Sequence, residues 1–506
     1  MTWISRGPAV SGRTIHDAVM AAARRDPARI AVRCEEHAIS YAELVTDAER
    51  IARHLIGTGV SPGGVVPVVA RRTADLPAVL LGVLLAGAAY ALLDVRWPVA
   101  RIAALLEAMR PTVVLADRTG AEHLAGAALE CVSFAELDSK ADLPLPEVTP
   151  DDVATLFWTS GSTGEPKAVL SPHRATTRLF GAEPCVPYGR APRMISAAAV
   201  AWDAFTLELW GMLTRGGTVL LHEDDVLLPA SVRAYVADFG ATHLFLTPAL
   251  FDVLVTADVE CFGGLRVLTL GGDRPPVENC RKLIDTFPSI ELYNGYGPVE
   301  SCVFVTTHRI DRTDLDGDGG IPVGRPVAGT DIYVVRDGAP VPGGEPGEIA
   351  IGGTGLARGY LGDPRRTAEV FRDLVVEGGT RRVYLTGDRG WLDGAGTLHF
   401  GGRLDSQFKI AGHRIEPGEI EAAARAVGCA QAVAMPVTRR NGTRCIALFA
   451  VPFEGRVTDE SMRAALKERL PGYMVPAAVH LLDSIPFTEN TKINRRALAS
   501  RFGYAP

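Results

Sequence analysis

The chain has 506 residues, of which 47% are hydrophobic and 22% are charged, a composition typical of a globular protein that buries large cores. Its formal charge of −7 and its pI near 5.9 argue against a nucleic-acid-binding protein, although a local basic patch remains open. The length predicts about two to four packed units. From the charge we expect the binding partners of the protein to be small molecules or other proteins.

Cysteine use and the N-terminal sequence indicate the cellular compartment. Eight cysteines are scattered along the chain without a C-x-x-C pair or the spacing of a zinc site. This pattern predicts reduced, mostly buried thiols in a cytoplasmic protein. The first ten residues, MTWISRGPAV, lack the apolar stretch of a secretory signal, so we expect none.

One uncharged run, residues 76–93, is near the lower length limit for a membrane span. Gly87 interrupts the run, and the residues after it have the character of a strand. We therefore expect a buried helix that turns at Gly87 into a core strand.

Helix and strand patterns alternate through most of the chain. Helical patterns at residues 41–55 and 231–239 lie among short apolar runs at 112–116, 218–221 and 243–247. Such alternation predicts an α/β fold with largely parallel sheets.

A change of character near residue 404 predicts a domain boundary. The preceding segment, from residue 320 to residue 401, is rich in glycine and short strands, as in GEIAIGG and TLHFGGR. The segment after it reads as α+β, with helices at 418–427 and 459–470 and strands at 430–436 and 445–451. We expect a large N-terminal domain of layered α/β subdomains, residues 1–404, and a small mobile C-terminal α+β domain, residues 405–506.

The strongest single motif follows an apolar strand at residues 154–158. There TSGSTGEPK, residues 159–167, combines glycines, hydroxyls and a lysine. Glycines allow close approach of the backbone to an anion, and successive N–H groups can surround it. The spacing is not that of a Walker A loop, and the alternative is a flexible polar turn. We interpret the segment as a phosphate-binding loop.

With six further segments in order, this loop resembles the adenylate-forming superfamily, specifically the amino-acid adenylation domains of nonribosomal peptide synthesis. The six are LLAGAAYALLD (84–94), NGYGPVE (294–300), GEIAIGGTGLARGY (347–360), YLTGD (384–388), GRLDSQFKIAGHRIEPGEIE (402–421) and NTKINRRAL (490–498). Two positions depart from the family pattern: Val299 stands where threonine is usual, and Thr491 stands where glycine is usual. The resemblance covers nearly the whole chain.

The resemblance implies ATP and Mg²⁺ as cofactors and assigns the nucleotide site. Lys492, Lys167 and Thr163 are the expected catalytic residues, and Glu300 is the expected magnesium ligand. Tyr296 would stack on adenine, Asn294 would bind its amino group, and Asp388 would accept from the ribose hydroxyls. The full nucleotide set is Thr159, Ser160, Gly161, Ser162, Thr163, Gly164, Lys167, Gly271, Gly272, Asn294, Tyr296, Gly297, Asp388 and Arg403. Asp405 would be the hinge.

These residues also have ordinary structural interpretations. Lys492 could be a solvated lysine in a mobile tail, and Glu300 could be a surface carboxylate. Tyr296 could be a packing aromatic, and Asp388 in T-G-D could be a turn residue. The motif matches favour the functional roles.

The segment AWDAFTLEL, residues 201–209, resembles the family's substrate motif and places Asp203 opposite a substrate α-ammonium group. The alternative is an exposed aspartate that caps a helix over residues 205–213. The implied pocket also contains Ala204, Leu207, Phe245, Leu268, Leu270, Gly295, Val303 and Phe304. For Phe245 and for Leu268, the residue next to it in the sequence is an alternative pocket residue. A lining without charge or hydrogen-bonding groups suits a valine- or isoleucine-sized amino acid, with 2-aminobutyrate, alanine and leucine as neighbours.

The resemblance implies that the activated amino acid passes to the phosphopantetheine thiol of a separate carrier protein, with a small activating protein as a further possible partner. No carrier segment follows residue 498, so we expect a free-standing enzyme or a domain of a larger synthetase. Three alternatives stay open: an acyl- or aryl-CoA ligase, a D-alanine–carrier protein ligase, and a non-catalytic homologue that binds a carrier protein. Asp203 argues against the first, and the presence of Lys167, Glu300 and Lys492 argues against the last.

Overall fold

The structure is a computed structural model that describes residues 5–8, 12–35, 37–139, 141–161, 164–317, 320–376, 378–439, 442–453, 458–486 and 493–504. The chain divides into two compact units. The first contains residues 1–94, 109–157 and 168–404, and the second contains residues 95–108, 158–167 and 405–506. Two short segments that we placed in the N-terminal domain thus belong to the second unit. The division into domains at residues 404 and 405 stays a prediction.

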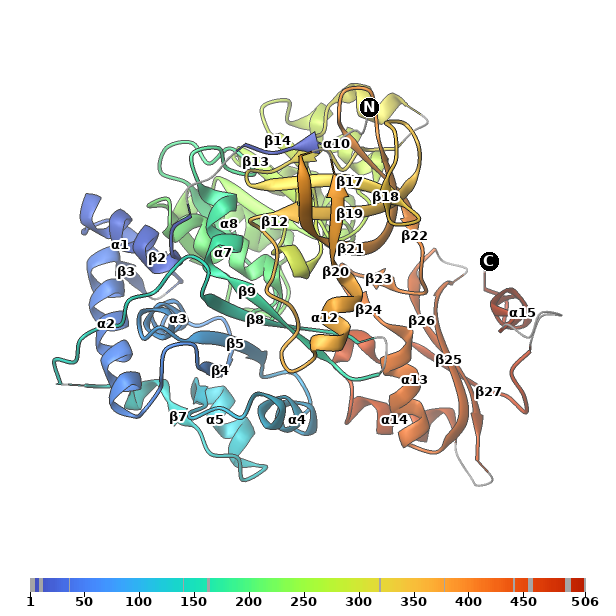
Figure 1. Ribbon diagram of the computed structural model, residues 1–506, viewed down its shortest axis with the longest axis horizontal. Coiled ribbons are helices and arrows are strands. Elements are labelled where there is room, and N and C mark those ends of the chain that lie inside the picture. The colour runs from blue at the N-terminus through green and yellow to red at the C-terminus, as the bar shows by residue number, and fades with distance from the viewer. Residues whose placement is uncertain are drawn as a thin grey trace. The chain divides into compact units, whose positions relative to one another are not determined.

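A nine-stranded sheet forms the centre of the first unit (Figure 1). Its strands, in spatial order, are β16 (Arg325–Pro326), β15 (Thr306–Arg309), β14 (Glu291–Tyr296), β13 (Val267–Gly271), β12 (His243–Leu246), β10 (Arg193–Ser196), β11 (Thr218–Leu221), β2 (Ile30–Arg33) and β3 (Ala38–Ser40). The six strands from β14 to β2 are parallel, and the remaining three are antiparallel. In such a sheet, ligands bind outside the carboxyl ends of the parallel strands.

A second sheet in this unit has six strands, of which the first five are parallel. In spatial order they are β7 (Val132–Ser133), β6 (Leu115–Ala116), β4 (Val65–Ala70), β5 (Ala89–Asp94), β8 (Val153–Thr159) and β9 (Lys167–Pro172). The sheet brings β5 beside β8, whose last residues begin the predicted phosphate loop.

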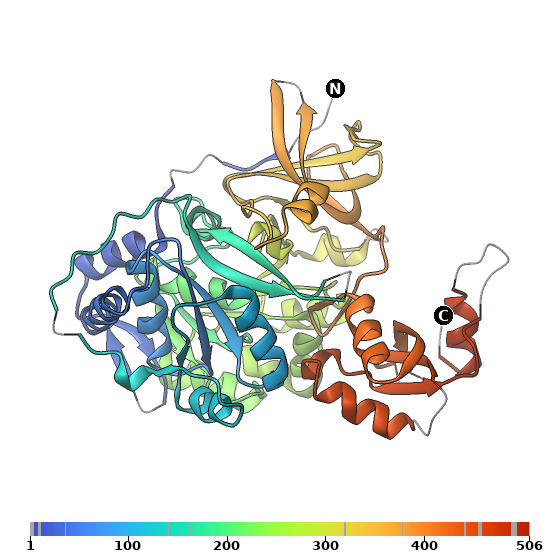
Figure 2. The ribbon, with the colours of Figure 1, turned by 60° about the horizontal axis from the view of Figure 1, so that its bottom comes forward.

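A third sheet is antiparallel and contains the glycine-rich segment. It consists of β1 (Ser5–Arg6), β17 (Thr330–Arg336), β18 (Ala339–Pro340), β19 (Gly347–Gly353), β20 (Phe371–Val376), β21 (Gly379–Leu392) and β22 (Leu398–Arg403). Figure 2 shows its yellow and orange strands as a group of their own within the first unit. The pairing of β21 with β22 places Asp388 opposite Arg403.

Helices cover both faces of the parallel sheets. In the first unit they are α1 (Ile15–Arg25), α2 (Tyr41–Gly57), α3 (Leu76–Leu85), α5 (Arg118–Ala125), α6 (His173–Thr177), α7 (Asp203–Leu213), α8 (Pro229–Phe239), α9 (Pro248–Asp258), α10 (Val277–Thr286), α11 (Arg312–Asp316) and α12 (Pro364–Val370). Short 3₁₀-helices include η2 (Arg178–Phe180) and η4 (Val299–Ser301). Side chains of α7 belong to one buried cluster, whereas those of α8, α9 and α10 belong to another.

The second unit is α+β. It contains α4 (Val99–Met109), the hairpin of β23 (Phe408–Ile410) and β24 (His413–Ile415), the three-stranded sheet of β25 (Cys429–Thr438), β26 (Arg444–Pro452) and β27 (Ala478–Leu481), and the helices α13 (Pro417–Ala426), α14 (Asp459–Lys467) and α15 (Arg495–Arg501). The class and the elements agree with the prediction for this part of the chain.

Most elements predicted from periodicity are present. The apolar run is α3, which is buried throughout, followed by Gly87 with φ of 75° and the buried strand β5. The predicted strand at residues 112–116 is shorter, because β6 pairs with β4 only at Leu115 and Ala116. None of the eight cysteines forms a disulfide, and seven of them are buried.

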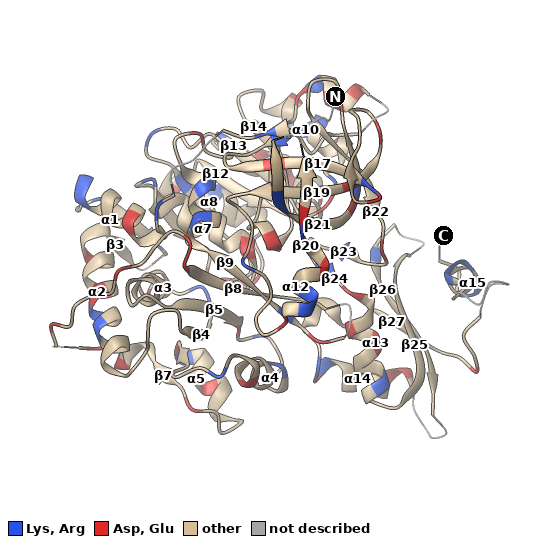
Figure 3. Ribbon diagram, viewed as in Figure 1, with Lys and Arg blue, Asp and Glu red and all other residues tan. Residues whose placement is uncertain are grey.

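Charge is distributed over the chain as its composition suggests. Figure 3 shows basic and acidic residues interspersed along most helices and strands, whereas the short helix α15 has the sequence RRALASR and carries basic residues without acidic ones. Among the residues that the structure describes, no helix combines the length and the apolar character that crossing a membrane requires.

Candidate functional site

Asp203 is the first residue of α7 and is only 5% exposed. The alternative of an exposed cap is therefore wrong: the helix begins two residues earlier than we expected, and Trp202 is its N-cap. Asp203 Oδ2 accepts a hydrogen bond of 3.0 Å from the N–H of Val303, a residue that follows η4. The helix N-terminus favours the negative charge of the buried carboxylate.

The segment that carries Val303 has an unusual backbone. Cys302 and Val303 have φ of 53° and 58°, in the left-handed region that a β-branched residue rarely occupies. Such conformations cost about 1–3 kcal/mol each and persist only where the surroundings hold them. We call residues 301–304 the 301–304 turn.

Buried apolar side chains surround the Asp203 end of α7. Ala204 and Leu207 belong to the same cluster as Phe245, Val303 and Phe304. The ring centroid of Phe245 lies 6.2 Å from that of Phe304 and 5.9 Å from that of Trp202. The structure therefore brings Phe245, Phe304 and Trp202 into contact, and the role of this set as a substrate pocket stays a prediction.

Two glycines at the carboxyl ends of β13 and β14 lie directly against the Phe304 ring. A Cβ added at Gly295 would meet Phe304 Cδ1 at 2.6 Å, and one added at Gly271 would meet Phe304 Cε1 at 2.9 Å and Phe245 Cε2 at 3.1 Å. Glycine is required at both places because the aromatic rings occupy the space of a side chain.

The assignment of Leu268 and Leu270 to this pocket is wrong. The parallel register of β12 and β13 pairs Phe245 with Thr269, so Leu268 and Leu270 face the opposite side of the sheet. Both leucines pack in the cluster formed with α8, α9 and α10. The residues on the Phe245 side are Thr269, which is a one-residue alternative to Leu268, and Gly271, which we predicted only as a nucleotide residue. Strand alternation counted from Phe245 would have identified them.

The predicted ribose and adenine residues lie near one another. Tyr296 donates to Asp388 Oδ2 over 2.6 Å, and Arg403 Nη1 donates to Asp388 Oδ1 over 2.6 Å. Burial, reinforced by the Asp388 carboxylate, raises the pKa of Tyr296 well above its usual value, so its hydroxyl stays protonated and donates. Asn294 is buried, and its side-chain nitrogen donates to Pro322 O over 2.8 Å.

The remaining nucleotide positions in the first unit have distinct surroundings. Gly272 has φ of 98°, which favours glycine. A Cβ added at Gly297 would clash with Val303 O and lie 2.9 Å from Phe304 Cα, so the backbone of the 301–304 turn packs on this glycine.

Glu300, in η4, is fully buried and accepts a 2.7 Å hydrogen bond from the Tyr360 hydroxyl. The interpretation of Glu300 as a surface carboxylate is therefore wrong. Over the described ranges of the chain, no cluster of three or more histidine, cysteine, aspartate or glutamate residues could hold a metal ion. A magnesium ion at Glu300 would thus need further ligands, such as phosphate oxygens.

The phosphate loop belongs to the second unit. Within that unit Ser160 Oγ donates to Arg414 O over 3.0 Å and accepts from Glu416 N over 3.2 Å. Gly161 and Lys167 are buried. Thr159 Oγ1 is also buried and has no hydrogen-bond partner among the described residues. Such an atom fits the role of a donor to an anion.

Gly164 of the same loop has φ of 94°, and a Cβ there would lie 2.6 Å from Ala422 Cβ. The predicted hinge residue Asp405 is exposed, and its Oδ1 accepts from the N–H of Gln407. Ser162, Thr163 and Lys492 lie outside the described residues. Their roles stay predictions.

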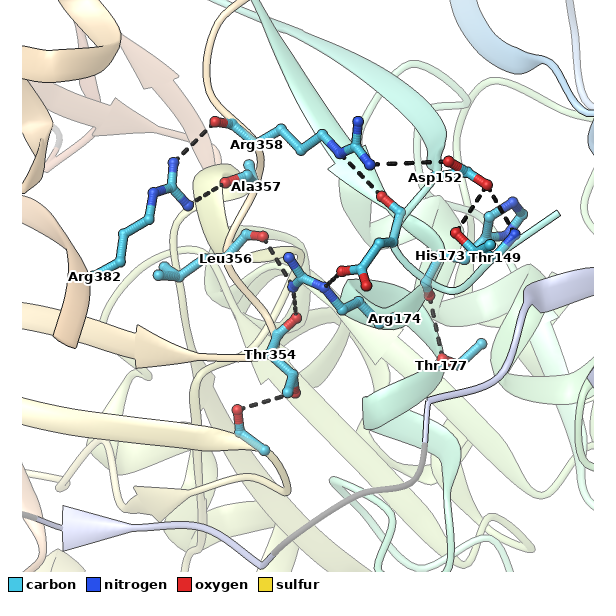
Figure 4. A network of polar contacts seen from close by, with 12 residues as sticks. Thr149, Asp152, His173, Arg174, Thr177, Thr354, Leu356, Ala357, Arg358 and Arg382 are labelled. Atoms are coloured by element: carbon cyan, nitrogen blue, oxygen red, sulfur yellow. Dashed lines mark hydrogen bonds and ion pairs between the residues drawn. The ribbon is translucent and has the colours of Figure 1, made fainter. Parts of the chain in front are cut away.

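A network around α6 connects arginines outside the motifs with backbone carbonyls of the motif segment 347–360 (Figure 4). Arg174 donates to Asp151 Oδ1 over 2.6 Å and to the carbonyls of Thr354 and Leu356. Arg382 Nη1 donates to Ala357 O over 2.9 Å. Arg178, at the start of η2, is 2% exposed and donates to carbonyls of the 301–304 turn. Nothing in the sequence around Arg178 signals this role, because its acceptors are more than 120 residues away.

Comparison with known proteins assigns the family. A family model described as AMP-binding enzyme matches residues 19–361. Gramicidin S synthase 2 from Brevibacillus brevis is 34% identical over 94% of this chain, and surfactin synthase subunit 2 from Bacillus subtilis (strain 168) is 34% identical over 96% of it. The chain spans only 11% and 14% of the lengths of these two proteins.

A solved structure of an NRPS protein containing adenylation and PCP domains is 31% identical, with a TM-score of 0.88, and the match covers 97% of this chain and 98% of that one. The chain therefore belongs to the AMP-binding enzymes, among the adenylation domains of nonribosomal peptide synthesis.

Proposed function

We propose that this chain activates a small aliphatic α-amino acid with ATP, forming an aminoacyl-adenylate and pyrophosphate, and then loads the acyl group onto the phosphopantetheine thiol of a carrier protein. The observation that carries the proposal is the buried carboxylate of Asp203 at the start of α7, hydrogen-bonded to Val303 N–H. Adenylation itself is the reaction expected of the family to which the chain belongs.

A buried carboxylate suits an amino acid better than a simple carboxylic acid. The α-ammonium group of an amino acid would form a charge-assisted hydrogen bond with Asp203, and the low dielectric around α7 strengthens such a bond. The Val303 N–H orients the carboxylate through Oδ2. An acid without an ammonium group would gain nothing from this contact.

The surroundings of Asp203 favour a small, uncharged side chain. The rings of Phe245 and Phe304 and the small residue Ala204 leave apolar surfaces near the carboxylate. The hydroxyl of Thr269 lies on the same side of β13 and is the one polar side chain that the corrected lining adds. Threonine therefore joins alanine, 2-aminobutyrate, valine, isoleucine and leucine among the substrates to be tested.

The nucleotide residues fit ATP in their chemistry. The buried Thr159 hydroxyl and the glycines of the phosphate loop suit phosphate oxygens, and the Asp388 carboxylate can accept from ribose hydroxyls. The side-chain N–H of Asn294 donates to Pro322 O. The side-chain oxygen of Asn294 is therefore the atom that can accept from an adenine amino group.

Glu300 is the residue that we propose for magnesium, and Tyr360 orients it through the 2.7 Å hydrogen bond. A magnesium ion bound there would neutralise phosphate charge. Lys492 is proposed to neutralise the charge where the substrate carboxylate meets the α-phosphate. The new bond joins that carboxylate oxygen to the α-phosphorus, and the bond from the α-phosphorus to pyrophosphate breaks.

The carrier protein is proposed from the relatives. The solved NRPS protein contains adenylation and PCP domains in one chain. The carrier protein could be part of the same polypeptide or a separate protein. Loading of holo-carrier proteins added in trans distinguishes these two arrangements.

The decisive test is amino-acid-dependent ATP–pyrophosphate exchange over a panel that includes the six amino acids above, phenylalanine, a fatty acid and an aryl acid. Asp203→Asn keeps an acceptor for Val303 N–H and removes the charge. We expect the KM for the amino acid to rise at least about 30-fold, the equivalent of about 2 kcal/mol for a lost buried charge contact.

Asp117→Ala is the matched control, since Asp117 is also 5% exposed and accepts from two backbone N–H groups, those of Gly120 and Arg71, at the start of a helix. This variant should keep the KM for the amino acid. Exchange with fatty or aryl acids but with no amino acid would refute the proposal and leave Asp203 a structural residue.

A further inference from the structure

Arg178 is a buried cation that the proposed reaction does not use. Its side chain is 2% exposed, and Nη2 donates to Ser301 O over 2.5 Å, to Phe304 O over 2.8 Å and to Cys302 O over a longer 3.4 Å. All three acceptors are backbone carbonyls of the 301–304 turn. Hydrogen bonds from a charged donor are stronger than bonds between neutral groups.

The turn that Arg178 holds contributes directly to the proposed amino-acid site. Its central residue, Val303, donates the N–H that orients Asp203, and its last residue, Phe304, contributes the ring against Gly271 and Gly295. The left-handed conformations of Cys302 and Val303 require restraint from outside the turn. Arg178 donates hydrogen bonds to three carbonyls of the turn, those of Ser301, Cys302 and Phe304. These bonds fix the orientation of the peptide planes in the turn.

A second segment also packs against the guanidinium. A Cβ added at Gly355 would lie 2.6 Å from both Cζ and Nη2 of Arg178, so the backbone of Gly355 is in close contact with it. Neighbouring carbonyls of that segment, those of Thr354 and Leu356, accept from Arg174, and those of Ala357 and Arg358 accept from Arg382 (Figure 4). The guanidinium therefore contacts two pieces of backbone, that of the 301–304 turn and that of Gly355.

We propose that Arg178 is a positioning residue for the amino-acid site: it holds the 301–304 turn in the conformation that orients Asp203 and places the Phe304 ring. The inference rests on the proposed function, because it assigns Asp203 to the substrate ammonium group. It predicts that the loss of Arg178 weakens amino-acid binding and relaxes side-chain selectivity, while ATP binding is affected much less.

Burial lowers the pKa of Arg178 to about 10, with the charge of Arg174 as a smaller contribution. The guanidinium is therefore still protonated at neutral pH and can donate to the carbonyls. A cavity of about 300 Å³ lies beside it, lined in part by Arg174, Thr177, Arg178 and Thr354. The cavity offers a small cation a path to the position that a truncated side chain would leave.

The experiment compares exchange kinetics of the wild type, Arg178→Ala and Arg215→Ala. Arg215 is a matched control, because it also donates to two backbone carbonyls, those of Phe180 and Gly181, and neither acceptor belongs to the turn. We expect Arg178→Ala to raise the KM for the amino acid at least about tenfold, with the KM for ATP changed less than about twofold, and millimolar guanidinium to restore the amino-acid KM. Arg215→Ala should show neither the selective rise nor the rescue.

Each result decides the matter. A parallel rise of both KM values, or no rescue by guanidinium, would show a merely structural role and overturn the inference. If Arg178→Ala does not fold, Arg178→Lys, which keeps a positive donor but loses the planar fork, serves for the same comparison of KM values. A wild type that shows no amino-acid-dependent exchange would refute the proposed function, and the inference with it, before any variant is compared.

Discussion

His173 makes the stability of the first unit depend on pH. It is the first residue of α6, is 1% exposed, and accepts at Nδ1 a 3.2 Å hydrogen bond from the N–H of Ile15, the first residue of α1. Burial and, to a smaller extent, the neighbouring His16, whose ring centroid is 5.3 Å away, lower its pKa to about 3, whereas Asp152 opposes the shift. Figure 4 shows His173 beside Asp152.

The sign follows from comparing the two states. The unfolded chain binds a proton at His173 near its usual pKa of 6.5, but the folded chain does so only near 3, so the unfolded state binds more protons between these values. The contribution of this group to stability is therefore complete above pH 6.5 and is lost as the pH falls toward 3. Between pH 7 and pH 5 the loss is about 2 kcal/mol.

His173→Asn removes this dependence while its side-chain oxygen can still accept from Ile15 N–H. Urea unfolding at pH 7 and at pH 5 should show that the variant loses about 2 kcal/mol less than the wild type over this interval. His37→Asn is the control, because His37 is exposed and should leave the difference unchanged. The same pH dependence in the wild type and in His173→Asn would refute the reasoning. His16→Asn, measured in the same way, separates the contribution of the neighbouring ring, whose own pKa is lowered by burial.

Two further substitutions test packing at and near the site. Gly297→Ala would place a methyl group against Val303 O and Phe304 Cα, and we expect exchange activity to fall at least about tenfold, whereas Gly394→Ala, which meets nothing within 4 Å, should be active. Trp210→Phe removes a buried 2.8 Å hydrogen bond to the Tyr90 hydroxyl and leaves a gap, which should lower the free energy of unfolding by about 2–3 kcal/mol. A double-mutant cycle with Tyr90→Phe would isolate the hydrogen bond, and additive effects would contradict its importance.

Local patterns predicted most elements of this fold because the signals that define them are local. The strand β11 has the predicted limits, and α2 begins at Tyr41 as expected, since Ser40 and Glu43 form a capping box there. The predicted strand at residues 112–116 was too long, because its length is set by its partner β4, which pairs with only two residues of β6. Pairing partners are not visible in the hydrophobicity of a segment.

The candidate site shows the same limit at the level of single side chains. Motif resemblance placed Leu268 and Leu270 in the predicted pocket, whereas the register of β12 and β13 places Thr269 and Gly271 on the same side of the sheet as Phe245. A shift of one residue reverses the face of a strand, so an error too small to affect the family assignment changes the chemistry of the lining. The corrected lining has the Thr269 hydroxyl and the glycine Gly271 in place of the two leucines of the predicted lining.

The same reasoning explains why the 301–304 turn could not be predicted. Val303 is a strand-forming residue, and nothing adjacent to it favours a left-handed conformation. Its conformation depends on Asp203, 100 residues earlier, and on Arg178, whose acceptors lie 123 to 126 residues away. Because strain in the turn is offset by these distant contacts, it can be maintained only when the first unit is folded. A ligand ammonium group at Asp203 would then meet a carboxylate that is already oriented, which reduces the entropy lost on binding.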